Sequence, residues 1–132
     1  MKIVISGSML FFKDMQFYEG ILKEKNIDVV IPMQDDWRNI TTKSEKIKYK
    51  KLISIQYFDE LSSQDTDGIL VLNQKKEGIE NYIGANTFAE IVIAFYFKKH
   101  IYLLNDYYEP YNDELEGWGA MPLRGNINNF IT

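Results

Sequence analysis

Two short apolar runs near the middle of the chain limit the folds that it can adopt. They span Gly68–Asn73 and Ile101–Leu104 and are rich in Ile, Val and Leu, without alternating polar residues. Such runs are typical of strands that are buried on both faces of a parallel sheet. The apolar segment Phe88–Lys99 precedes the second run and is expected to form a well-buried helix. The sequence therefore predicts a βαβ unit with a right-handed crossover.

The loop between the first run and this helix is unusually long. Connections of this kind usually have about 2–6 residues, whereas this loop spans Gln74–Asn86 and contains Gly78 and Gly84. It ends at a helix N-terminus, which presents free N–H groups and a partial positive charge. Glu90 follows within the expected first helical turn. A carboxylate is therefore expected beside the crevice where open parallel sheets bind ligands.

A purely structural role for Glu90 is equally open. Thr87 and Glu90 have the spacing of a capping box, in which the Glu side chain accepts a hydrogen bond from the N–H of the cap residue. A given rotamer of Glu90 cannot cap the helix and face a ligand at the same time. The sequence alone does not choose between the two roles.

The rest of the chain continues the alternation of strands and helices. The expected strands are Lys2–Ile5, Asp28–Ile31 and an edge strand at Ala120–Leu123, and the expected helices are Asp14–Lys25, Ser44–Ser63 and one turn at Asp113–Gly117. The apolar residues expected to face inward from the long helix are Ile47, Leu52, Ile55, Phe58 and Leu61. The polar stretch Met33–Thr42, with Trp37, is expected to be a loop. Together these elements predict one three-layer α/β domain over residues 1–132, with a doubly wound parallel sheet of about five strands in the order 2-1-3-4-5.

In such a sheet the chain connections reverse direction between strands 1 and 3, and ligands bind above the carboxyl ends of these strands. Two loops meet there, Gly7–Phe12 after the first strand and Gln74–Thr87 after the third. The candidate binding residues from these loops are Gly7, Ser8, Met9, Gly84, Asn86 and Thr87, with Glu90 beside them. A plain strand-ending turn is the alternative for Gly7 and Ser8, because neither a P-loop nor a dinucleotide-binding glycine pattern is present.

Composition excludes several classes of function. The chain has no cysteine, and its one histidine, His100, directly precedes a buried strand, so neither a metal site nor a cofactor is expected. The net charge is −4, and no basic run is dense enough for a nucleic-acid site. The sequence contains no recognisable signal peptide or membrane span, so we expect a cytoplasmic protein with a small-molecule ligand.

Three features of the sequence are similar to those of a known superfamily. They are the strand leading into Gly7-Ser8, the run Asp67-Gly-Ile-Leu-Val-Leu, and the glycine-containing loop that leads to Glu90. These resemble the nucleoside 2-deoxyribosyltransferase-like superfamily, and the nearest branch is the 2′-deoxynucleoside 5′-phosphate N-hydrolases. The resemblance implies a flavodoxin-like, Rossmann-like fold in a homodimer or larger oligomer. It also implies cleavage or transfer at the N-glycosidic bond of a nucleoside or nucleotide.

The resemblance implies roles for particular residues. Glu90 falls on the nucleophilic glutamate, which either attacks C1′ or stabilises an oxocarbenium-like transition state. Asp59 falls on a second acid, which would protonate the departing base. Its alternative is an ordinary carboxylate on the surface of a helix. Met121 lies in an Ala-Met…Arg-Gly stretch that approaches a neighbouring subunit's site in the family.

The chain also departs from the N-hydrolases. Leu10 stands where they place an arginine, and Gly84 and Gly119 stand where serines help to hold the 5′-phosphate. The bidentate grip on phosphate is therefore missing, which predicts weaker discrimination between nucleotide and nucleoside unless Lys75, Lys76 or Arg124 substitutes. Two functions remain open at this point. One is an N-glycosidase or deoxyribosyltransferase, and the other is a catalytically silent module that binds a nucleotide-derived ligand.

Overall fold

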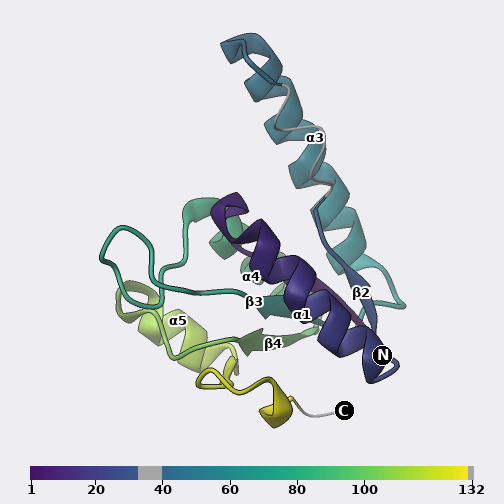
Figure 1. Ribbon diagram of the computed structural model, residues 1–132, viewed down its shortest axis with the longest axis vertical. Helices are drawn as coiled ribbons and strands as arrows, with labels where there is room; N and C mark the ends of the chain where they lie inside the picture. The colour runs from purple at the N-terminus through teal and green to yellow at the C-terminus, as the bar shows by residue number, and fades with distance from the viewer. Residues whose placement is uncertain (33–39, 131–132) are drawn as a thin grey trace.

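The computed structural model describes residues 1–32 and 40–130, and most of the predicted loop around Trp37 lies outside these ranges. The described chain forms a five-stranded parallel sheet in the order β2-β1-β3-β4-β5 (Figure 1). The strands are β1 (Lys2–Ser6), β2 (Asp28–Val30), β3 (Gly68–Val71), β4 (His100–Leu103) and β5 (Met121–Pro122). The predicted strand order and the short edge strand are both confirmed.

Helices connect these strands on both faces of the sheet. The α-helices are α1 (Phe12–Glu24), α3 (Lys43–Ser62), α4 (Ala85–Tyr96) and α5 (Asn112–Gly117), and the 3-10 turns are Met9–Phe11, Glu109–Tyr111 and Ile127–Asn129. Of the helices in the described ranges, none is long and apolar enough to cross a membrane. The predicted helices are present, but α4 begins at Ala85, earlier than the predicted start at Phe88.

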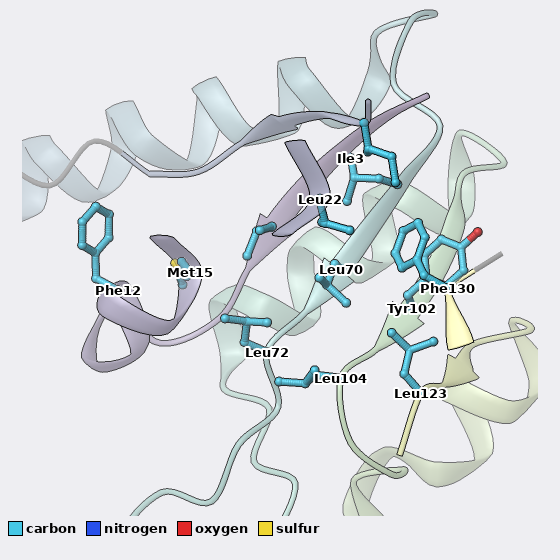
Figure 2. Packing of buried hydrophobic residues seen from close by; sticks show 12 residues of the cluster. Ile3, Phe12, Met15, Leu22, Leu70, Leu72, Tyr102, Leu104, Leu123 and Phe130 are labelled. Atoms are coloured by element: carbon cyan, nitrogen blue, oxygen red, sulfur yellow. The ribbon is translucent and has the colours of Figure 1, made fainter. Parts of the chain in front are cut away.

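Side chains that alternate along the strands divide the core into two layers. Ile3 and Ile5 of β1 point toward α1, while Val4 points toward α3 and α4. Figure 2 shows the first layer, in which Met15 and Leu22 of α1 belong to the same cluster as the strand residues. Two C-terminal residues also belong to this layer, Leu123 and Phe130, and the ring of Phe130 stacks on Tyr102 at 4.1 Å between centroids. The second layer contains residues of α3, α4 and α5, namely Tyr57, Leu61, Ile91, Ala94 and Leu115.

The prediction for the inner face of α3 is partly wrong. Leu61 is buried and Phe58 half-buried, but Ile47, Leu52 and Ile55 are 61%, 52% and 47% exposed. Figure 1 shows the reason, because the N-terminal part of α3 extends well beyond the sheet. A helix of 20 residues is about 30 Å long, whereas a strand of 3 to 5 residues covers roughly half of that length. The spacing of apolar residues correctly predicts a helix here, but it does not predict how much of the helix packs against the rest of the protein.

Candidate active site

Glu90 projects from the second turn of α4 and is only 8% exposed. Gly84 is the N-cap of this helix and makes no side-chain capping bond, so Thr87 lies inside the helix. The capping-box interpretation is therefore wrong, as is the placement of Glu90 in the first turn. Both errors have one cause, since a Gly-Ala-Asn start lacks the usual side-chain signal for a helix N-terminus.

The carboxyl group of Glu90 accepts a hydrogen bond from Ser6. Ser6 is the last residue of β1, is fully buried, and donates through its hydroxyl to Oε1 of Glu90. Because strand side chains alternate, Ser6 lies on the same face of the sheet as Val4, the face that α3 and α4 cover. A hydroxyl thus stands at a position where the neighbouring residues of this face are apolar.

Burial changes the acidity of Glu90. Loss of solvation raises the pKa of this carboxyl from 4.5 to about 7, and the Ser6 hydrogen bond and the positive charge of Lys50 oppose that rise. Near neutral pH both the ionised and the protonated forms are therefore populated. A carboxylate with such a pKa suits a group that changes its charge during a reaction.

A cavity of about 320 Å³ opens beside Glu90 at the carboxyl ends of β1 and β3. Gly7, Met9, Asn86 and Thr87 line it, as the meeting of the two loops predicts. The other wall comes from α3, through Lys46, Tyr49, Lys50, Ile53 and Tyr57. This volume falls within the range of about 300–1,000 Å³ that small-molecule sites occupy.

A second cavity of about 540 Å³ adjoins the first and shares Gly7, Met9, Lys50, Asn86 and Thr87 with it. Ser8 and Gly84 line this second cavity, together with Lys76 and Tyr82. The Nζ of Lys76 lies 5.1 Å from the centre of the Tyr82 ring. The predicted glycine-loop residues therefore lie around one recess made of two connected parts.

Gly7 and Ser8 also have structural tasks. A Cβ at Gly7 would lie 3.2 Å from the carbonyl oxygen of Leu72, so glycine permits the close approach of β1 to the end of β3. The hydroxyl of Ser8 accepts a hydrogen bond from the N–H of Leu10 at 3.3 Å and caps the 3-10 turn. Gly7 thus lines the recess and also serves the end of the strand, which was the alternative given for it.

Asp59 and Glu90 lie on different cavities. Asp59 is exposed near the C-terminus of α3 and lines a neighbouring hollow of about 560 Å³. This hollow and the Glu90 cavity share Pro32, Ile53 and Tyr57 in their linings. Among the described residues that line the Glu90 cavity, no second carboxyl group occurs.

Other predicted residues lie outside the recess. Met121 belongs to β5 and packs against the core layer that contains α1. Leu10 is 70% exposed and lines neither part of the recess. Lys75 pairs with Glu80 at 3.2 Å. Of the substitute cations named from the sequence, Lys76 reaches the recess.

Among the residues of this site that the sequence did not predict are Ser6, Lys50 and Tyr57. The signal for Ser6 was a polar residue at the end of an apolar strand, on the face shared with Val4. Lys50 and Tyr57 carried no comparable signal, because the lysines of α3 have the pattern of a solvated helix face. In the described ranges, no cluster of three or more His, Cys, Asp or Glu side chains is arranged to hold a metal ion.

Comparison with known proteins bears on the fold. No family model matches the chain, and no curated protein matches it in sequence. The solved structure of the CMP N-glycosidase BcmB from Clostridium botulinum is similar, with a TM-score of 0.53. The likeness covers 98% of this chain and 92% of that chain, at 14% identity. The two chains share a fold. The doubly wound α/β arrangement predicted from the sequence is thereby confirmed a second time.

Proposed function

We propose that this protein cleaves the N-glycosidic bond of a nucleoside or nucleotide, with Glu90 acting at C1′ of the sugar. The observation that carries this proposal is a buried carboxylate on a cavity at the point where the sheet connections reverse. A structural neighbour described as a CMP N-glycosidase supports the same chemistry. The resemblance of the Gly7-Ser8 turn and of the loop before Glu90 supports it independently.

The ionised form of Glu90 performs the proposed step. Its carboxylate either forms a bond to C1′ or stabilises positive charge on the sugar, while the bond to the base breaks and its electron pair leaves with the base. Water in a hydrolase, or a second base in a transferase, then forms a bond to C1′ and loses a proton, while any bond between C1′ and Glu90 breaks and the carboxylate is regenerated. Incubation with and without an acceptor base, followed by chromatography, distinguishes these two outcomes.

Asp59 as proton donor to the departing base stays a prediction of the resemblance. Asp59 lines the hollow next to the Glu90 cavity and not that cavity itself, so the prediction is tested by substitution. If Asp59→Asn lowers base release while the fold is retained, Asp59 takes part in the reaction. Unchanged base release would remove it from the mechanism, and the proton would then come from another source.

Positive charge at the recess favours a nucleotide over a nucleoside. Lys50 lines both parts of the recess and Lys76 lines the outer part. These ammonium groups replace the missing arginine as the charges that a 5′-phosphate would meet. We therefore include CMP and dCMP, each with its nucleoside, in the panel of candidate substrates.

A catalytically silent binding module is the second candidate. The absence of another carboxyl group among the described lining residues of the Glu90 cavity favours it. Calorimetry on the same panel, run beside chromatography for free base, separates the two functions. Binding without base release supports the silent module, and base release supports the enzyme.

A homodimer or larger oligomer is part of the proposal. Ile47, Leu52 and Ile55 of α3 are exposed, as are Phe95 and Tyr96 of α4. Exposed large apolar side chains of this kind are enriched at interfaces between protein chains. Light scattering at micromolar concentration is expected to give at least twice the monomer mass, and replacement of Leu52 and Ile55 by Glu is expected to lower it. A monomeric unmodified protein would contradict this part.

A further inference from the structure

The end of β1 carries an unexplained hydroxyl in an apolar setting. Ser6 is fully buried, and its register partner on β3 is Val71. Both Val4 and Val71 belong to the apolar layer under α3 and α4. A buried hydroxyl without a partner is unfavourable, so its position needs a partner, and that partner is Oε1 of Glu90.

We propose that Ser6 is a positioning residue, which fixes the orientation and favours the ionised form of the Glu90 carboxylate. This inference rests on the proposed role of Glu90. The Ser6 hydroxyl donates a hydrogen bond to Oε1, which leaves Oε2 as the oxygen that can approach C1′. A central strand holds the donor and the buried face of α4 holds the acceptor, so the carboxyl plane is set before substrate arrives.

The hydrogen bond also opposes the effect of burial on Glu90. A donor to a carboxylate stabilises its charged form, so Ser6 keeps the pKa of Glu90 lower than burial alone would set it. The titratable groups that face Glu90 across the cavity from α3 are Lys46, Tyr49, Lys50 and Tyr57. Of these, Lys50 acts in the same direction as Ser6.

The test compares Ser6→Ala with the unmodified protein over a range of pH. We expect kcat to fall roughly 10- to 100-fold with little change in KM, because a hydrogen bond to a charged group is lost. We also expect the midpoint of the pH dependence of kcat/KM to move upward by about one unit or more. Ser6→Thr, which keeps the hydroxyl, should restore both quantities toward their original values.

A matched control separates positioning from simple stability. Thr66 is also buried and donates through its hydroxyl to the carbonyl oxygen of Glu60 at 2.7 Å, in a different part of the fold. Thr66→Val should lower stability without moving the pH midpoint. If Ser6→Ala fails to fold, Ser6→Cys keeps a weaker donor of similar size and should fall between serine and alanine.

Titration of Glu90 by carbon-13 NMR makes the outcome independent of activity. If the unmodified protein releases no base, the proposed function fails, while the titration still tests Ser6. A higher pKa of Glu90 in Ser6→Ala would support the inference. An unchanged Glu90 titration, or an unchanged kcat and pH midpoint in an active Ser6→Ala enzyme, would overturn it.

Discussion

The hydroxyl of Tyr57 donates a hydrogen bond to the carbonyl oxygen of Ile5 at 3.0 Å. This contact joins α3 to the end of β1, at the residue next to Ser6. Tyr57 is 6% exposed and lines both the Glu90 cavity and the hollow that contains Asp59. One side chain therefore contacts the strand that carries Ser6 and lines the cavities of both carboxyl groups assigned from the sequence.

Tyr57→Phe is expected to destabilise the protein by about 1–2 kcal/mol. The change removes one buried hydrogen bond and leaves the Ile5 carbonyl oxygen without that donor, while the ring still fills its place. Urea denaturation followed by circular dichroism measures the free energy of unfolding. No loss of stability would mean that the contact does not hold α3 to β1.

Glu90→Gln is expected to stabilise the protein at alkaline pH. The fold raises the pKa of Glu90 from 4.5 to about 7, so the folded state holds this proton more tightly than the unfolded state. Stability from this group is complete below pH 4.5 and is lost as pH rises through 7. The gain of Glu90→Gln over the unmodified protein should therefore grow by on the order of 2–3 kcal/mol between pH 5 and pH 8.

Thermal and urea denaturation at both pH values test this expectation, with Glu116→Gln as the matched control. Glu116 is an exposed carboxylate of α5. Its replacement should leave the difference in unfolding free energy nearly independent of pH. A difference in unfolding free energy between Glu90→Gln and the unmodified protein that stays the same from pH 5 to pH 8 would contradict the raised pKa of Glu90.

Lys50→Ala and Lys76→Ala are expected to reduce the preference for a nucleotide over its nucleoside, each by up to about tenfold. Both ammonium groups line the recess. Lys48→Ala on the same helix as Lys50 is the control, because Lys48 lines neither part of the recess. The measurement is the ratio of kcat/KM for CMP and cytidine. If the ratio of kcat/KM in Lys50→Ala and in Lys76→Ala equals the ratio in Lys48→Ala and in the unmodified protein, neither lysine contacts the phosphate.

The sheet could be predicted well because short segments of the sequence identify its strands. Apolar runs mark the strands β3 and β4, and the alternation of strands with helices fixes the doubly wound order. The same order brings Gly7 and Asn86 to one cavity with Glu90. These relations follow from chain connectivity, which a single sequence contains.

The remaining features depend on packing that no local pattern records. The exposed side of α3 follows from the length of the helix relative to the sheet, not from its periodicity. The start of α4 at Ala85 was missed because Gly84 caps it without a side-chain bond. Ser6 was missed because its partner, Glu90, lies far away in the sequence. Asp59 was assigned by counting along the chain, and such a count does not show that its side chain lines the hollow next to the Glu90 cavity and not that cavity itself.

Release of free base by the unmodified protein and by Glu90→Gln shows whether Glu90 acts at an N-glycosidic bond. The substrates are CMP, dCMP and their nucleosides, and the product is quantified by chromatography at pH 8, where Glu90 is mostly ionised. We predict base release from at least one of them, with kcat/KM rising as pH increases through about 7. Glu90→Gln should lower this rate by roughly 100-fold or more while it keeps the fold. A folded Glu90→Gln variant that releases base as fast as the unmodified protein would contradict the account.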